Sequence, residues 1–197
     1  MPLEGPVSRY LNRRLSRPLA RAAERAGLTP NQVTLLSTAS VLAVPALFAL
    51  DRPRLAGLAI HAASVVDGVD GDLARATGQT STFGAILDAV SDRYVDAAII
   101  ASMTWWSAKR ERRPFTVPAG LAALVGSLMV SYSRARTEAE TRATLDASLQ
   151  GYATRDVRLL LAALGSATRH VDTALLTLAL MTNASVLRRL VRLRSQL

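Results

Sequence analysis

The sequence predicts an all-α protein: an integral membrane bundle of six transmembrane helices, preceded by an amphipathic interfacial helix and forming one domain over residues 1–197. Two observations predict this class. Apolar residues make up 50% of the 197 positions, and they gather in long runs with few or no charges, as in membrane helices. The net charge is +9, and arginines cluster at the ends of those runs, which is typical of the cytoplasmic side of a membrane protein.

Residues 7–27 predict the interfacial helix. Arginines recur there at spacings of three and four, and leucines occupy a second face. A basic face beside an apolar face suits a helix that lies on an anionic membrane surface. The alternative is a solvated helix packed on a soluble core. Gly27 and Pro30 then predict the end of this helix and the start of the next one.

Six apolar segments predict the membrane spans. They lie at about residues 33–50, 55–74, 83–106, 115–133, 156–170 and 173–190. About 20 helical residues cross a hydrocarbon layer of roughly 30 Å, and the last two segments are the shortest. Six spans place both termini on one side. Most basic residues share that side, and basic residues are enriched on the cytoplasmic side of membrane proteins. We therefore predict a cell-membrane protein whose termini and aspartates face the cytoplasm. The basic loop 109–113 argues for the opposite orientation.

The composition excludes several classes of function. The chain has no cysteine, which rules out disulfides, thiolate metal sites and cysteine nucleophiles. A basic chain can also bind nucleic acid. That alternative requires the apolar runs to fold in water, so we expect no nucleic-acid partner.

Six aspartates lie within the second and third apolar segments or at their ends. They are Asp67, Asp70, Asp72, Asp88, Asp92 and Asp96. A carboxylate in such a place is costly unless a cation or a hydrogen bond compensates it. Helical spacing would put the first two on one face and the last three on another, and the short connection makes the two helices antiparallel neighbours. We therefore expect converging carboxylates that bind Mg²⁺ or Mn²⁺, with enough ligands for two ions: Asp67, Asp70, Asp88 and Asp92.

Small residues and one arginine accompany these aspartates. Gly71, Ala74 and Gly84 would let a ligand approach the backbone closely, and Arg75 offers a fork of donors for a phosphate. Metals beside such an arginine indicate phosphoryl chemistry. Asp92 lies deeper in its segment than Asp88 and is the better candidate for a general base that takes a proton from an attacking hydroxyl. The alternative is a transporter that relays protons or cations through intramembrane aspartates.

The whole pattern resembles the signature of the CDP-alcohol phosphotransferase family. It reads Asp67-x-x-Asp70-Gly71-x-x-Ala74-Arg75, eight residues, then Gly84-x-x-x-Asp88-x-x-x-Asp92. The resemblance extends to the segment Thr29–Thr34 and to the six-span layout. It implies a homodimeric enzyme of phospholipid biosynthesis that is embedded among membrane lipids. Such an enzyme transfers a substituted phosphoryl group from a CDP-alcohol donor to the hydroxyl of a polar alcohol acceptor and releases CMP.

The resemblance also implies roles for individual residues. Asp67, Asp70 and Asp88 would hold the metals, and Asp92 would be the general base and a further ligand. The CDP moiety would be held by Asn31, Thr34, Gly71, Ala74, Arg75 and Ser81. Asp72 and Asp96 fall at positions that the signature leaves free, and for them we expect supporting or structural roles.

Four arginines are candidates for binding an anionic acceptor, such as a sugar or polyol phosphate: Arg134, Arg136, Arg155 and Arg158. The alternative is that they only make a basic cytoplasmic loop. The stretch Ser131–Glu138 resembles the branch of the family that uses inositol phosphate, with CDP-diacylglycerol or a related CDP-lipid as donor. The stretch Thr154–Arg158 also resembles the branch that makes di-inositol phosphate phosphate from CDP-inositol and inositol phosphate, so the donor stays open.

Overall fold

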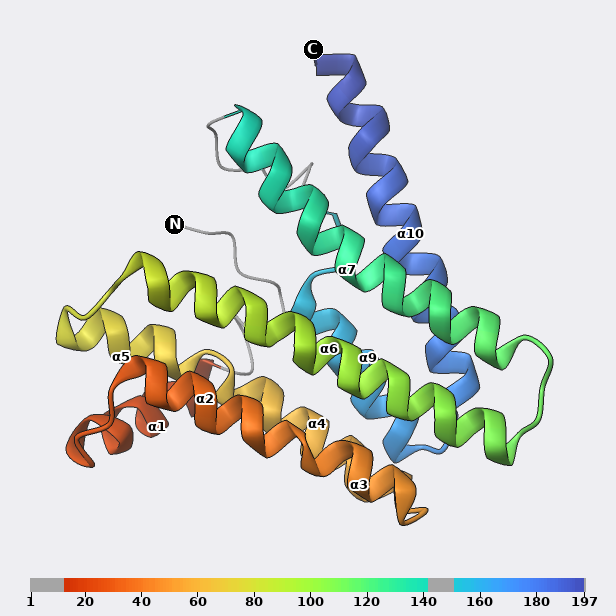
Figure 1. Cartoon of the computed structure of the whole chain (residues 1–197), viewed down its shortest axis with the longest axis horizontal. Coiled ribbons are helices and arrows are strands. Elements are labelled where there is room, and N and C mark those ends of the chain that lie inside the picture. The colour runs from red at the N-terminus through yellow and green to blue at the C-terminus, as the bar shows by residue number, and fades with distance from the viewer. Residues whose placement is uncertain (1–12, 142–150, 197) are drawn as a thin grey trace.

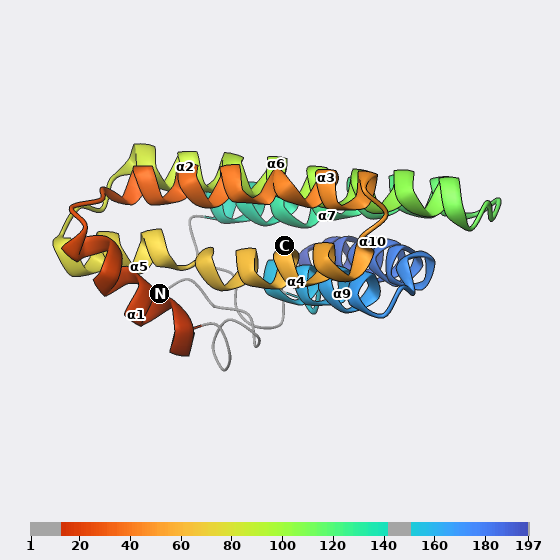
Figure 2. The ribbon, with the colours of Figure 1, turned by 90° about the horizontal axis from the view of Figure 1, so that it is seen from below.

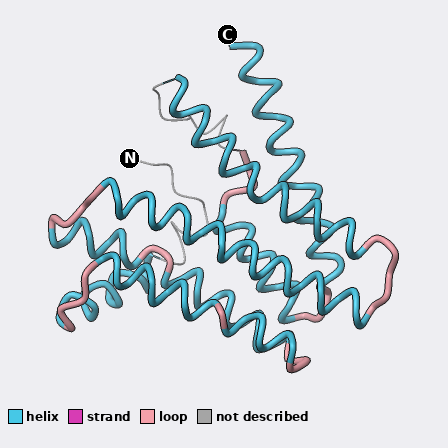
Figure 3. The backbone as a smooth tube through the Cα atoms, viewed as in Figure 1, coloured by secondary structure: helices cyan, strands magenta, loops and turns pink. Residues whose placement is uncertain are grey.

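The computed structural model describes residues 13–141 and 151–196, and within these ranges every regular element is an α-helix (Figure 3). The helices are α1 (Arg13–Arg25), α2 (Pro30–Val41), α3 (Ala43–Ala49), α4 (Pro53–Val66), α5 (Val69–Thr77), α6 (Thr82–Arg110), α7 (Thr116–Thr141), α9 (Arg155–Ala167) and α10 (Val171–Gln196). The predicted all-α class is therefore confirmed for the described residues. The first part of the predicted interfacial helix, residues 7–12, lies outside them.

The helix ends follow from local sequence. Thr29 and Gln32 form a capping box at the start of α2, in which each side chain accepts a hydrogen bond from the backbone N–H of the other, and Pro30 is the first helical residue. Gly27 follows α1 and Gly78 ends α5, both with positive φ. Glycine adopts this conformation without the steric cost of a Cβ atom. The predicted boundary at Gly27 and Pro30 is thus confirmed.

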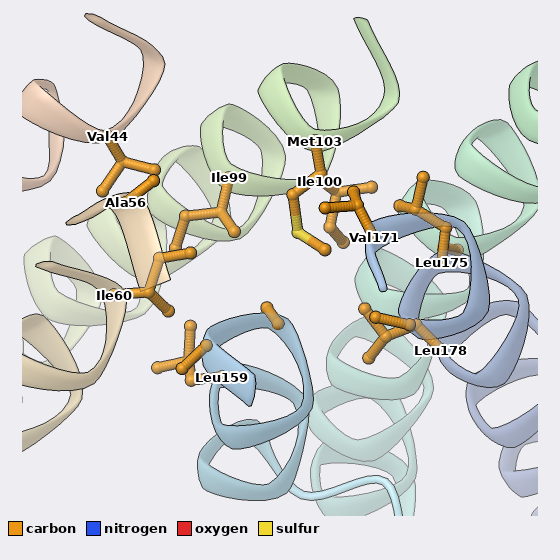
Figure 4. Packing of buried hydrophobic residues seen from close by; sticks show 14 of the residues in the cluster. Val44, Ala56, Ile60, Ile99, Ile100, Met103, Leu159, Val171, Leu175 and Leu178 are labelled. Atoms are coloured by element: carbon orange, nitrogen blue, oxygen red, sulfur yellow. The ribbon is translucent and has the colours of Figure 1, made fainter. Parts of the chain in front are cut away.

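The helices form two layers. Figure 2 shows α2, α3, α6 and α7 in one layer and α1, α4, α5, α9 and α10 in the other. Apolar side chains from both layers meet between them, among them Ile60, Met103 and Leu175, which are completely buried (Figure 4). Gly57 lets α4 and α9 approach closely, because a Cβ atom there would lie 2.5 Å from the carbonyl oxygen of Ala163.

Polar contacts join the helices at one end of the bundle. The buried carboxylate of Asp172, at the start of α10, accepts hydrogen bonds from Ser107 of α6 and from Thr116 of α7, the latter at 2.8 Å. Trp106 donates from Nε1 to Asp51 at 2.8 Å, which ties the turn after α3 to α6. The turns between α3 and α4, α6 and α7, and α9 and α10 all lie at this end (Figure 1). The aspartates of the signature lie towards the other end.

Two of the predicted continuous helices are interrupted. Over residues 33–50 the chain forms α2 and α3, which are separated at Leu42. Over 55–74 it forms α4 and α5, because Asp67 and Gly68 make a turn between them. Glycine is a poor helix former, which favours a break at this place. The prediction that Asp67 and Asp70 share one face of a single helix is therefore wrong.

Three helices are longer than predicted. α6 and α10 each extend beyond their apolar segment, and α7 continues through a polar stretch that was expected to be a connection. Ion pairs one turn apart support the end of α7: Arg134 with Glu138 at 3.0 Å and Arg136 with Glu140 at 2.5 Å. Pairs at this spacing stabilise a helix in contact with water.

Within the described residues, three helical stretches are long and apolar enough to cross a membrane: Pro30–Ala49, Thr116–Thr141 and Val171–Ser195. They coincide with the predicted first, fourth and sixth spans. The second span is divided between α4 and α5, the third carries the aspartates of α6, and α9 has only 13 residues. Length and composition therefore identify three of the six predicted spans.

Candidate active site

Three carboxylates of the signature converge at one point. Asp67 caps the end of α4, and Asp88 and Asp92 lie one turn apart on α6. Each of them offers an oxygen atom within 4.8 Å of the other two. The short link between α5 and α6 makes this possible, because α6 returns alongside the helices that precede it, as Figure 1 shows. The predicted convergence is confirmed for these three residues, which we call the carboxylate group.

Arg155, the first residue of α9, lies against the carboxylate group. Its guanidinium contacts Asp67 and Asp92, the latter at 3.0 Å, and it approaches Asp96 at 3.4 Å. The side chain of Arg155 is only 15% exposed. Clustered carboxylates in a poorly solvated place need a nearby cation, and Arg155 supplies one from within the chain.

Asp70 is not one of the three carboxylates of this group, but it lies beside them. Its side chain accepts a hydrogen bond from Thr34 Oγ1 at 2.5 Å and from the backbone N–H of Gly71 at 2.6 Å. It lines the same pocket as Asp88. Carboxylate oxygens are the ligands that Mg²⁺ and Mn²⁺ prefer, so the three converging carboxylates, with Asp70 beside them, fit a divalent cation.

All six residues predicted to hold a nucleotide line one pocket of about 320 Å³. They are Asn31, Thr34, Gly71, Ala74, Arg75 and Ser81. The pocket, which we call the donor pocket, lies between the start of α2, the helix α5 and the start of α6. Asp70 and Asp88 also line it, so it reaches the carboxylates.

Gly84 shapes the donor pocket. Ser81 caps α6 by accepting a hydrogen bond from the backbone N–H of Gly84 at 3.0 Å. A Cβ atom at Gly84 would lie 3.0 Å from Ser81 Oγ and 3.1 Å from Asn31 Oδ1. These distances are too short for an unstrained contact, so glycine leaves room for two polar side chains that face the pocket.

A second pocket, of about 340 Å³, adjoins the carboxylate group on the side of α7 and α9. Asp67 and Asp92 line it together with five arginines, and we call it the basic pocket: Arg93, Arg134, Arg155, Arg158 and Arg189. Three of the four predicted acceptor arginines are thus brought together. The fourth, Arg136, is not among the lining residues, and its side chain is 65% exposed in the pair with Glu140.

Arg189 was not among the predicted site residues. Its side chain is 2% exposed and donates to the carbonyl oxygen of Val130 at 2.8 Å and to Ser133 Oγ. In the sequence it belongs to a basic C-terminal run that is typical of a cytoplasmic tail. Nothing in that run distinguishes it, because only the packing of α10 on α7 turns this arginine inward.

Asp72 and Asp96 have contacts that fit the supporting roles expected of them. Asp72 accepts a hydrogen bond from Ser16 of α1 and pairs with Arg75. Asp96 is buried and accepts from Ser127 at 3.0 Å and from Arg158 at 2.7 Å. Neither belongs to the carboxylate group. Asp96 instead holds the arginines of α9 in place.

The fold and the site together define a helical bundle of membrane type, in which a carboxylate group joins a donor pocket to a basic pocket. A family model described as CDP-alcohol phosphatidyltransferase matches residues 27–190. The chain belongs to this family, and the resemblance of the signature is confirmed.

Two curated relatives belong to the inositol-phosphate branch. The chain is 43% identical over 192 residues to the bifunctional IPC transferase and DIPP synthase of Rubrobacter xylanophilus, covering 97% of this chain and 43% of that protein. It is 43% identical over 127 residues to the phosphatidylinositol phosphate synthase of Mycolicibacterium smegmatis, covering 64% of this chain and 57% of that protein. The chain thus spans less than two thirds of the length of these relatives.

Solved structures of a further relative share the fold. The crystal structure of Mycobacterium tuberculosis phosphatidylinositol phosphate synthase with CDP-DAG bound superimposes with a TM-score of 0.79 at 32% identity, covering 90% of this chain and 92% of that one. The same protein in complex with manganese and citrate gives a TM-score of 0.77, covering 89% of this chain and 87% of that one.

Proposed function

We propose that this chain is a membrane enzyme that transfers a substituted phosphoryl group from CDP-diacylglycerol, or a related CDP-lipid, to a hydroxyl of inositol phosphate or another polyol phosphate. CMP is released, and the product is an acidic phospholipid. One observation carries the proposal: the donor pocket and the basic pocket meet at the carboxylate group. The names of the relatives, and the CDP-DAG bound to the Mycobacterium tuberculosis protein, support it.

The donor pocket would hold the CDP moiety, with the diphosphate towards Arg75 and the carboxylates. The guanidinium of Arg75 presents paired donors to phosphate oxygens. Asp67, Asp70, Asp88 and Asp92 would hold one or two Mg²⁺ or Mn²⁺ ions, which would neutralise the diphosphate when bound. The manganese complex of the Mycobacterium tuberculosis protein supports a divalent metal.

The basic pocket would hold the phosphate of the acceptor. Arg134, Arg158 and Arg189 line it, and their charge suits a phosphate dianion. Asp92 belongs to the carboxylate group and also lines this pocket. This position supports Asp92 as the base: it would take the proton of the acceptor hydroxyl while the hydroxyl oxygen bonds to phosphorus and the bond from phosphorus to the CMP oxygen breaks.

We also propose the finer architecture: one membrane domain with six spans, α1 as an interfacial helix, the active site facing the cytoplasm, and a homodimer. Large apolar side chains on the outside of the bundle support immersion in lipid. Leu36, Leu58 and Leu121 are each more than half exposed, at 58%, 63% and 57%. Exposed apolar surface of this extent is unusual for a protein in water.

CDP-inositol is a second candidate donor. The alignment with the bifunctional IPC transferase and DIPP synthase covers 97% of this chain, whereas the alignment with the Mycolicibacterium smegmatis synthase covers 64%. In that case the acceptor would again be inositol phosphate, CMP would leave, and the product would be a di-inositol phosphate that keeps the acceptor's own phosphate, a di-inositol phosphate phosphate. The transporter alternative finds no support in the family to which the chain belongs.

A donor–acceptor panel tests the proposal. Purified protein in detergent, with Mg²⁺ or Mn²⁺, is offered CDP-diacylglycerol or CDP-inositol against inositol phosphate, glycerol phosphate, serine and inositol, and CMP is measured. We expect the fastest release with CDP-diacylglycerol and inositol phosphate. If CMP is released with CDP-inositol but not with CDP-diacylglycerol, CDP-inositol is the donor. An uncharged acceptor that gives more CMP than the phosphorylated acceptors would contradict the role of the basic pocket. No CMP from any pair would refute the proposed reaction.

A further inference from the structure

Three side chains connect α1 to the donor pocket. Ser16 of α1 donates from Oγ to Asp72 Oδ2 at 3.0 Å, and Arg75 donates from Nη2 to Asp72 Oδ1 at 2.6 Å. Each oxygen of the Asp72 carboxylate thus has its own donor. Arg75 lines the donor pocket, whereas Ser16 lies outside it.

We propose that Ser16 and Asp72 are positioning residues for Arg75, so that the docking of α1 on α5 sets the affinity for the CDP donor. The inference rests on the proposed function of the donor pocket. It goes beyond the signature, which leaves position 72 free and does not include α1.

Arg75 needs an external constraint to hold one geometry. Its side chain is 56% exposed, and a long exposed side chain loses entropy when it is fixed. The pair with Asp72 alone would contribute little, because exposed ion pairs are weak. Gly71 leaves room for the observed geometry: a Cβ atom there would lie 3.3 Å from Nη1 of Arg75 and 3.5 Å from Nη2, so the guanidinium lies close over the α5 backbone.

Ser16 is fixed by packing. It is 2% exposed, and Ala20, one turn further along α1, is 6% exposed. Ala20 belongs to a small apolar cluster with Val69 and Leu73 of α5, so this side of α1 is docked on the helix that carries Asp72 and Arg75. The hydroxyl of Ser16 therefore reaches Asp72 from a rigid position, and the carboxylate can in turn orient Arg75.

The helix α1 also carries a basic surface next to the residue that contacts Asp72. Arg17 and Arg21 lie exposed on α1, beside the buried Ser16 and Ala20. Exposed arginines on an interfacial helix bind anionic lipid headgroups. Any change in how α1 lies on the membrane would thus be transmitted to Arg75 through Asp72.

A double-mutant cycle on CDP binding tests the inference. Binding of CDP with Mn²⁺ is measured for the full chain in detergent and for the variants Ser16→Ala, Asp72→Asn, Arg75→Ala and Ser16→Ala with Arg75→Ala. We expect Ser16→Ala and Asp72→Asn each to weaken CDP binding about three- to tenfold. In the Arg75→Ala background, Ser16→Ala should have no further effect, because its partner is gone.

Ser195→Ala is the matched control. Ser195 is an exposed helical serine whose hydroxyl donates to the carbonyl oxygen of Arg192, and it is not among the residues that line the donor pocket, so its removal should leave CDP binding unchanged. An equal loss from Ser16→Ala in both backgrounds, or no loss in either, would overturn the inference. The readout is separate from the reaction: if the protein binds CDP but releases no CMP from any donor, the proposed function fails while the cycle still decides the role of Ser16.

Discussion

The guanidinium of Arg155 lies 3.0 Å from the carboxylate of Asp92, inside the carboxylate group that we propose holds the metal. The same side chain contacts Asp67. Arg155 therefore compensates the charges that a divalent cation would compensate, and the two cannot occupy the same contacts. We therefore expect a metal ion held by Asp67 and Asp92 to compete with Arg155 for these carboxylates.

This competition predicts the behaviour of Arg155→Gln. Without metal the variant removes the arginine partner of Asp67 and leaves Asp92 with the weaker contact to Arg93 at 3.3 Å, so its unfolding midpoint should fall. Loss of one partner from a buried ion pair costs up to about 3–5 kcal/mol. Added Mn²⁺ should raise the midpoint more in the variant than in the wild type, because no arginine has to be displaced. Thermal unfolding in detergent, with EDTA and then with a Mn²⁺ titration, measures both effects.

Arg136→Gln is the matched control for this experiment. Its pair with Glu140 is exposed at both ends, 65% and 62%, so removal should cost less than about 1 kcal/mol and leave the response to Mn²⁺ unchanged. Equal Mn²⁺ responses in Arg155→Gln and wild type would show that Arg155 and the metal do not compete.

Asp92→Asn should abolish most of the transfer while the fold persists. Asparagine has nearly the same shape but cannot accept the proton of the acceptor hydroxyl, and general-base catalysis contributes about 10²–10⁴ to a rate. We expect CMP release with CDP-diacylglycerol and inositol phosphate to fall at least about 100-fold. Glu140→Gln, an exposed carboxylate on α7, is the control and should retain the wild-type rate. A rate for Asp92→Asn within tenfold of the wild type would exclude Asp92 as the base.

The sequence predicts the parts of this site that depend on local spacing. Asp88 and Asp92 lie one turn apart, so any helix through them aligns their side chains, and the short link before α6 brings them to Asp67. The six residues that the family resemblance implies for the nucleotide come from the start of α2, from α5 and from the start of α6, and all six line one pocket. Local spacing was sufficient for Asp88 and Asp92, and the signature was sufficient for the lining of the pocket.

The remaining features depend on tertiary packing. The break at Gly68, which separates Asp67 from Asp70, was not predicted, because the helix of residues 55–66 was extended through the aspartates to reach the length of a membrane span. The contact of Arg155 with the carboxylates depends on how α9 packs against α4 and α6, and no spacing within one helix encodes it. Arg189 is buried for the same reason, since it faces the neighbouring helix α7.

Gly84→Ala should weaken donor binding more than it weakens the fold. The added methyl group would press on Ser81 and Asn31 at 3.0 and 3.1 Å, and both side chains line the donor pocket. Overpacking of about 1–2 kcal/mol corresponds to roughly a tenfold loss of affinity. We therefore expect the KM for the CDP donor to rise about tenfold with kcat changed less than twofold.

Gly57→Ala is the contrasting variant. There the methyl group would meet backbone atoms of Ala163 and Ala167 at 2.5 and 2.6 Å, which cannot yield, so the bundle should lose about 1–3 kcal/mol of stability. Its donor KM should stay near the wild-type value. Equal effects of the two variants on KM would show that Gly84 acts through general packing rather than through the donor pocket.

The proposed six-span topology predicts the accessibility of introduced cysteines. The chain has no cysteine of its own, so a single cysteine can be labelled without background. Lys109 follows Trp105 and Trp106 near the end of α6, and Ser195 lies near the end of α10, both exposed.

With six spans and a cytoplasmic N-terminus, an impermeant maleimide applied to intact cells should label Lys109→Cys and should not label Ser195→Cys. Opening the cells should expose both, and the unsubstituted chain should stay unlabelled. Labelling of Ser195→Cys alone in intact cells would invert the proposed orientation and place the carboxylate group on the outer face. Labelling of both would contradict the three spans that the proposed topology places between residues 109 and 195, because an odd number of spans puts the two positions on opposite sides.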